Sequence, residues 1–145
     1  MSASLSSRRV AWATFALSLA GAGVSLYLTW YGITYPTGSC PLTGALSCSA
    51  VLSSPYSKSY GVPVASFGLA WFLVAAWLGY GLARNGIGAR KLLAWSLTGL
   101  VGVVGLVYVE LFVVGALCLY CTSAHVLSLS ILACSASVWC QSRKR

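Results

Sequence analysis

Four long apolar stretches are the feature that most constrains how this chain can fold. They cover residues 10–31, 64–83, 92–117 and 118–139. A helix that crosses the hydrocarbon core of a bilayer needs about 20 mostly apolar residues, and each stretch reaches that length. Because lipid offers no hydrogen-bond partner to a bare backbone, helices are the expected form of these spans. The sequence therefore predicts an all-α integral membrane four-helix bundle, with residues 1–145 as a single membrane domain.

The composition also indicates a chain that faces lipid. Charged residues make up 7% of the 145 residues and hydrophobic residues 59%, whereas soluble domains carry about 25% charged residues. The net charge of +8 comes from residues that flank the apolar stretches, which indicates membrane orientation rather than a nucleic-acid partner. The first stretch is longer than the core of a cleavable signal peptide, so we expect it to be retained.

Lysine and arginine residues lie almost entirely at one end of the expected bundle. Lys58 is the exception among the nine. The other eight flank the termini and the second connection: Arg8, Arg9, Arg84, Arg90, Lys91, Arg143, Lys144 and Arg145. Since basic flanks stay in the cytoplasm, we expect a multi-pass protein of the cell membrane with both termini cytoplasmic. The polar loop over residues 32–63 and a tight turn at Gly115 then face outward.

Four of the six cysteines fall on that outer side. Cys40 and Cys48 lie in the outer loop, and Cys118 and Cys121 form a C-x-x-C motif at the start of the last stretch. Disulfides persist in the oxidising space outside the cytoplasm. A helix N-terminus favours the thiolate, which is the form that exchanges disulfides or attacks a quinone. The spacing therefore predicts two redox-active pairs, one in a flexible loop and one fixed, that exchange electrons.

Two other interpretations of these four cysteines are open. They can form two purely structural disulfides, or they can supply four thiolates to a zinc ion, although a metal is less natural at an oxidising membrane face. We expect no metal. Two further cysteines lie deeper in the last stretch. We expect Cys134 to be a small buried side chain and Cys140 to be reduced near the cytoplasmic end.

The chain has one histidine, His125, and one acidic residue, Glu110, and both lie within expected spans. Ionisable residues inside a membrane are functional candidates. His125 follows Cys121 by one helical turn, where an imidazole can hydrogen-bond a quinone carbonyl or give it a proton; a bond to a neighbouring helix is the alternative. Glu110 precedes Cys118 by eight residues, about 12 Å along a helix. There it can be neutral, relay protons, or bond a hydroxyl group of another span.

Several other residues of the spans are candidates for pocket lining or for packing. Ser66 and Trp71 in the second stretch and Tyr108 in the third can line a pocket, with helix packing as the alternative. Glycine favours close approach of membrane helices. We therefore expect close packing at five glycines: Gly21, Gly23, Gly99, Gly102 and Gly105.

The sequence around both cysteine pairs resembles the vitamin K epoxide reductase family. The resemblance rests on four spans, on Cys-Pro-Leu-Thr-Gly-Ala-Leu-Ser-Cys over residues 40–48 with the following residues 49–63, and on Cys-Leu-Tyr-Cys over residues 118–121. It implies a bundle of four helices around a quinone of the ubiquinone, menaquinone or phylloquinone type. It also implies that the outer loop caps the quinone pocket.

The resemblance implies a role for each outer cysteine. Cys121 would lie next to the quinone, Cys118 would exchange with Cys48, and Cys40 would complete the shuttle pair. A thioredoxin-like thiol protein would reduce the loop pair from the outer side. Many relatives carry such a domain fused to the membrane part, whereas this chain ends at Arg145, so we expect a separate partner.

The implied activity is that of a thiol:quinone oxidoreductase that supports disulfide bond formation, and from their places in the spans we expect His125 and Glu110 to supply hydrogen bonds or protons. One alternative is reduction of vitamin K epoxide. The mammalian enzymes have a tyrosine at the place of His125 and an asparagine in the second span, and residues 64–66 here contain no asparagine. The other alternative is a small transporter with Glu110 as its proton site, which leaves the outer cysteines without a role.

Overall fold

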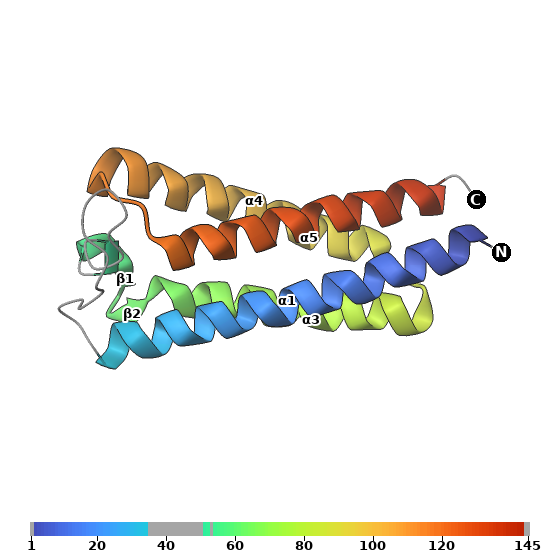
Figure 1. The fold of residues 1–145 in the computed structure, drawn as a ribbon, viewed down its shortest axis with the longest axis horizontal. Coiled ribbons are helices and arrows are strands. Elements are labelled where there is room, and N and C mark those ends of the chain that lie inside the picture. Colours follow the sequence, from blue (N-terminus) through green and yellow to red (C-terminus); the bar gives the residue numbers. More distant parts are fainter. Residues whose placement is uncertain (1, 35–50, 53, 144–145) are drawn as a thin grey trace.

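The computed structural model describes residues 2–34, 51–52 and 54–143. Four helices run along its long axis (Figure 1). They are α1 (Ser2–Thr34), α3 (Val64–Asn85), α4 (Ala89–Tyr108) and α5 (Leu119–Arg143), and a π-helix, η2 (Val109–Val114), continues α4. Before α3 lie a 3-10 helix, η1 (Pro55–Ser57), and an antiparallel ladder of β1 (Lys58–Ser59) and β2 (Val62–Pro63). The predicted all-α architecture is confirmed.

Each of the four helices is long and apolar enough to cross a membrane. The spanning segments are Ser7–Thr34, Val64–Asn85, Ala89–Val114 and Leu119–Arg143. At most of their ends they extend by a few residues beyond the apolar stretches, because polar and basic residues are also compatible with a helix where it leaves the hydrocarbon. The third span instead ends at Val114, three residues before the expected bound, and the fourth begins at Leu119, one residue after the expected start. The chain is thus a multi-pass membrane protein.

The helices form a bundle with two ends of different character. The end that we call the loop end carries η1, the β1–β2 ladder and the connection between η2 and α5 (Figure 1). The other, the terminal end, carries both termini and the connection between α3 and α4. α1 packs against α3 and α5, and α4 packs against α5, whereas α3 and α4 touch much less. The bundle is therefore more loosely joined on the side between α3 and α4.

Glycines in the left-handed conformation end two of the helical segments. Gly86 follows α3 with φ 68° and donates its N–H to the carbonyl oxygen of Leu82. Gly115 follows η2 with φ 68° and donates its N–H to the carbonyl oxygen of Glu110. Left-handed φ is strained for residues with a Cβ atom, so glycine is favoured at both ends. The turn predicted at Gly115 is present.

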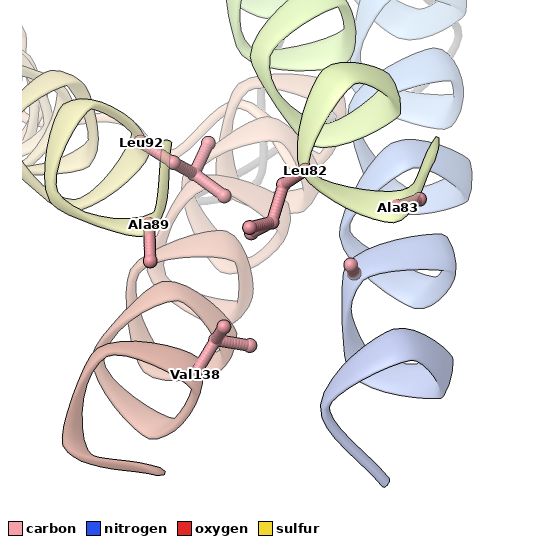
Figure 2. Packing of buried hydrophobic residues seen from close by; sticks show 6 residues of the cluster. Leu82, Ala83, Ala89, Leu92 and Val138 are labelled. Carbon is pink, nitrogen blue, oxygen red and sulfur yellow. The ribbon is translucent and has the colours of Figure 1, made fainter. Parts of the chain in front are cut away.

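Small apolar side chains close the terminal end. The cluster contains Leu82 and Ala83 of α3, Ala89 and Leu92 of α4 and Val138 of α5. Figure 2 shows Leu82 pointing toward Leu92, whereas Ala83 lies on the side of α3 next to α1. The side chain of Leu92 is fully buried in this cluster. Side chains thus fill the gap between α3 and α4 at the terminal end. The remaining space between these two helices lies toward the loop end.

Close packing accounts for two of the five glycines singled out in the sequence. A Cβ atom on Gly21 would collide with the ring of Phe72, and one on Gly99 would collide with the ring of Trp71. The packing prediction is wrong for the other three, which have no atom within 4 Å of an added Cβ: Gly23, Gly102 and Gly105. Membrane glycines therefore mark two kinds of surface here, tight contacts and open space.

Candidate functional site

A cavity of about 730 Å³ lies toward the loop end of the bundle. Cofactor and ligand sites in proteins have volumes of this order and mostly apolar walls. The described part of the wall comes mainly from α3 and α4, with residues of α1, α5, η2 and the η1 segment. Its bulky apolar members include Leu28, Phe67, Trp71, Phe72, Val101 and Leu106. Because Phe67, Val101 and Leu106 are also exposed, the cavity is open on the side between α3 and α4.

One face of α5 supplies polar groups to the cavity. Cys121, His125 and Ser128 all line it, and their spacing of four and three residues places them on one helical face. His125 and Ser128 are both buried, and Cys121 is half-buried. A thiol, an imidazole and a hydroxyl group are thus aligned along a single wall. The i, i+4 relation of Cys121 and His125 is visible in the sequence.

Cys118 lies directly before α5, at the N-cap position. Its sulfur accepts a hydrogen bond from the backbone N–H of Cys121 at 3.4 Å, which is the bond that a capping side chain makes to the third residue of a helix. Cys118 is fully buried and is not among the described lining residues, whereas Cys121 lines the cavity. The two cysteines of the motif therefore have different surroundings, one capping the helix and one at the cavity.

Glu110 lies in the π-helix η2 and is 4% exposed. π-helices are rare and occur frequently at functional sites. The carboxyl group of Glu110 hydrogen-bonds the side chain of Cys121 and the backbone of Cys118. Its Oε2 atom is buried without a hydrogen-bond partner among the described residues. A buried polar atom without a partner costs about 1–3 kcal/mol, and Glu110 is a residue of the cavity wall, so its carboxyl group is a candidate contact for a ligand.

A tryptophan pair holds the wall between α3 and α4. The ring N–H of Trp71 donates to Oγ1 of Thr98 at 3.1 Å, and the ring N–H of Trp95 donates to the carbonyl oxygen of Trp71 at 3.1 Å. The two indole rings are stacked, with centroids 6.5 Å apart. Trp71 and Thr98 both line the cavity. These bonds fix the aromatic wall across the lightly packed side of the bundle.

Two of the other candidates from the sequence lie away from the described lining. The hydroxyl group of Ser66 donates to the carbonyl oxygen of Pro63 at 2.7 Å, and the lining instead contains its neighbours in α3. Tyr108 is exposed and stacks on Phe112 with ring centroids 5.1 Å apart. Both side chains are thus engaged outside the cavity wall.

The remaining cysteines fall into two groups. Cys40 and Cys48 lie outside the described residues. Cys134 and Cys140 are free thiols on α5; Cys134 is half-buried and Cys140 is exposed. Cys134 is therefore less buried than expected.

The sequence reasoning missed the contribution of α4 to the cavity. Gly99, Gly102 and Gly105 all line it, at a spacing of three residues. The spacing places the three glycines near one another on one side of α4. Gly99 is in close contact with Trp71, whereas Gly102 and Gly105 leave open space at the cavity.

The fold and the placement of the cysteine motif agree with one known family. The model of the vitamin K epoxide reductase family matches residues 12–136. The chain belongs to this family. Together with four apolar helices, membership of the vitamin K epoxide reductase family makes it a membrane oxidoreductase that works with quinones.

The residues of the cavity fit a quinone. A quinone consists of a flat ring with two carbonyl oxygens and an apolar tail, and so needs an apolar space with a few hydrogen-bonding groups. The wall offers aromatic and aliphatic side chains together with His125, Ser128 and Glu110. Residues that would hold the ring are thus present beside Cys121, the cysteine that lines the cavity.

Proposed function

We propose that the protein is a thiol:quinone oxidoreductase that oxidises a thioredoxin-like thiol protein and reduces a membrane quinone, in support of disulfide bond formation. The observation that carries the proposal is that Cys121 of the C-x-x-C motif lines a large apolar cavity together with His125 and Glu110. A purely structural disulfide needs no cavity of this kind. A proton-coupled transporter gives no reason for the carboxyl group of Glu110 to contact both cysteines of the motif.

The proposed cycle begins at the loop pair. The dithiol of the partner reduces a disulfide between Cys40 and Cys48 through a mixed disulfide. The thiolate of Cys48 then attacks the sulfur of Cys118 in the Cys118–Cys121 disulfide, which releases Cys121 as a thiolate. Cys40 attacks Cys48 in turn, restores the loop disulfide and frees Cys118. The loop pair has then passed two electrons to the fixed pair, and the two protons released by the partner dithiol convert the thiolates of Cys118 and Cys121 to thiols.

The second half of the cycle takes place at the cavity. A bound quinone accepts two electrons and two protons. The reduced Cys118 and Cys121 supply the electrons as they close to a disulfide, and Cys121 is the member that lines the cavity. His125 orients the ring by hydrogen-bonding one of its carbonyl oxygens, since its imidazole lies one helical turn beyond Cys121 on the same wall. The apolar wall excludes water from the reacting groups.

The start of α5 favours the thiol chemistry assigned to Cys118. A helix N-terminus carries a partial positive charge and free N–H groups, both of which stabilise a thiolate. The bond from the N–H of Cys121 to the sulfur of Cys118 supplies one such group. Cys118 is thereby a good leaving group when Cys40 resolves the mixed disulfide, because the displaced thiolate is stabilised where it forms.

The charge distribution supports an orientation with the loop end outside. Basic residues gather at the terminal end, where Arg84 lies in the last turn of α3 and Arg90 in the first turn of α4. Lys58 lies in β1 at the loop end. By the rule that basic flanks stay in the cytoplasm, both termini are cytoplasmic. The cysteine pairs then meet their partner on the outer side of the cell membrane.

Turnover of purified protein tests the proposal. The protein in detergent is supplied with a reduced thioredoxin-like protein and a short-chain ubiquinone or menaquinone, and quinone reduction is followed by absorbance. We expect turnover by the wild type and none by Cys118→Ser. Cys140→Ser, which removes an exposed thiol at the other end of α5, serves as the matched control with unchanged turnover. Absence of quinone reduction, or equal turnover without Cys118, would contradict the proposal.

Reduction of vitamin K epoxide is a second candidate activity, which the family match favours. It uses the same cysteine pair and the same cavity. The assay above separates the two activities when the epoxide replaces the quinone as electron acceptor. We expect the quinone to be the better acceptor, because His125 occupies the place of the tyrosine in the mammalian enzymes.

A further inference from the structure

The proposed reaction moves protons as well as electrons. Closing a dithiol to a disulfide releases two protons, and reducing a quinone to a quinol takes up two. In a cavity with mostly apolar walls, a titratable side chain has to carry these protons across. The described residues that line the cavity include five with titratable side chains: Tyr56, Lys58, Glu110, Cys121 and His125.

Among these five, Glu110 is the one whose contacts join the thiols to the cavity. Its carboxyl group hydrogen-bonds the side chain of Cys121 and the backbone of Cys118. Its Oε2 atom is buried and has no hydrogen-bond partner among the described residues, and the residue itself is part of the cavity wall. Glu110 therefore contacts the cysteine pair through its carboxyl group and also belongs to the wall of the cavity.

The backbone around Glu110 holds the carboxyl group in this place. The N–H groups of Gly115 and Ala116 both donate to the carbonyl oxygen of Glu110, the second at 3.2 Å. These bonds fix the end of η2 to the turn that leads directly to Cys118. Because the turn is short and Glu110 is buried, the carboxyl group is held beside the cysteine pair without depending on a long flexible connection.

The other titratable groups of the wall are less suited to this task. Tyr56 and Lys58 belong to the η1–β1 segment and are exposed, so they exchange protons with the solvent. His125 is buried and lies one turn beyond Cys121, where we place it as a hydrogen-bond partner of the ring. Glu110 is the group in contact with the reacting thiol.

We propose that Glu110 carries the protons from the cysteine pair to the quinone, an inference that rests on the proposed thiol:quinone reaction. As the sulfur–sulfur bond forms, the two S–H bonds break and two electrons pass to the ring. The carboxylate of Glu110 accepts the proton of Cys121 and donates it to the ring oxygen in the cavity. The proton of Cys118 follows through the same carboxyl group. Glu110 ends as it began, and both protons of the quinol come from the thiols.

Replacing the carboxyl group by an amide tests the inference. Glu110→Gln keeps the size and the hydrogen-bonding capacity of the side chain but cannot transfer protons. Two half-reactions are measured separately in the purified full-length protein: disulfide exchange with the reduced partner, and single-turnover reduction of a short-chain ubiquinone by the pre-reduced protein. We expect exchange to stay within about twofold of the wild type and quinone reduction to fall about 100-fold, the usual scale of acid–base catalysis.

The pH dependence separates proton transfer from a positioning role. In the wild type the single-turnover rate should change with the protonation of Glu110, alongside the thiols of Cys118 and Cys121 and the imidazole of His125. In Glu110→Gln the part of the profile that belongs to the carboxyl group should be absent. Loss of disulfide exchange and quinone reduction to the same extent would show that Glu110 only positions the cysteines, and would overturn the inference.

Chemical rescue provides a second variant if Glu110→Gln does not fold. Glu110→Ala opens space beside Cys121, and added formate can occupy it as a free carboxylic acid. We expect formate to raise the quinone-reduction rate of Glu110→Ala at least tenfold and to leave that of the wild type unchanged. No rescue in the folded variant overturns the inference. An inactive wild type would reject the proposed function itself, whereas an active wild type with an equally active Glu110→Gln rejects only the role of Glu110.

Discussion

The sulfur of Cys118 accepts the backbone N–H of Cys121 at 3.4 Å, so the first turn of α5 is capped by one cysteine of the motif through the amide of the other. The bond makes Cys118 part of the helix end as well as a reactive thiol. It also leaves the side chain of Cys121 for the cavity that this residue lines. Capping and cavity contact are thus divided between the two cysteines, and the division leads to separate predictions for each.

Cys121→Ser should trap an intermediate of the proposed cycle. Without the thiol of Cys121, the thiolate of Cys118 can only attack the loop disulfide at Cys48, which releases Cys40 as a thiolate. The Cys118–Cys48 disulfide cannot proceed to a Cys118–Cys121 disulfide, so a mixed disulfide at Cys118 should be detected. Non-reducing electrophoresis after proteolysis, with mass spectrometry of the linked peptides, detects it. Cys121→Ser combined with Cys118→Ser is the control and should form no such adduct. If the single variant also lacks the adduct, the assigned order of attack is wrong.

Cys118→Ser and Cys118→Ala should be equally inactive but differ in stability. Serine is a good N-cap residue and can accept the N–H of Cys121, whereas alanine cannot, at a cost of about 0.5–2 kcal/mol. Thermal unfolding of the two variants in the same detergent, under reducing conditions, measures the difference. We expect Cys118→Ala to unfold at the lower temperature. Equal unfolding temperatures would mean that the sulfur does not stabilise the start of α5.

Gly102→Leu should weaken quinone binding and leave the fold intact. Gly102 lines the cavity and has no atom within 4 Å of an added Cβ, so a leucine enters the space proposed for the ring or its tail. Crowding of this kind costs about 1–3 kcal/mol, so the KM for the quinone should rise about tenfold. Gly23→Leu on α1 is the matched control, because Gly23 also faces open space and lies outside the described lining. A KM that is unchanged in Gly102→Leu would place the quinone elsewhere.

Labelling of Cys140 should reveal the orientation in the membrane. Cys140 is an exposed thiol near the C-terminus, on the side that the basic residues assign to the cytoplasm. A membrane-impermeant maleimide should leave it unlabelled in intact cells and label it once the membrane is permeabilised. Cys140→Ser identifies the labelled band. Labelling of Cys140 in intact cells would reverse the proposed topology and place the loop end in the cytoplasm.

The sequence was sufficient for the parts of the structure that depend on local spacing. The four spans follow from the lengths of the apolar stretches, and the turn at Gly115 follows from glycine at the join of two spans. The shared face of Cys121 and His125 follows from their separation by four residues. In each case the deciding interaction lies within one helix or one turn, so no knowledge of neighbouring helices was required.

The parts that were missed depend on contacts between segments. A straight α-helix places Glu110 about 12 Å from Cys118 along the axis, but the chain reverses at Gly115 and brings the carboxyl group to both cysteines of the motif. The π-helix that positions Glu110 leaves no clear pattern in the apolar sequence. Ser66 was a candidate for the pocket because the sequence does not define how α3 is rotated, and its hydroxyl group instead bonds Pro63.

The open side between α3 and α4 has a consequence for how the protein would encounter a lipophilic substrate. Phe67 and Val101 border the opening and are exposed, so in a bilayer they meet the acyl chains. A hydrophobic molecule dissolved among those chains then arrives by lateral diffusion and never passes through water. Its effective concentration is a mole fraction in the lipid phase. Apparent affinities from different preparations are therefore comparable only after correction for the volume of lipid or detergent into which the substrate partitions.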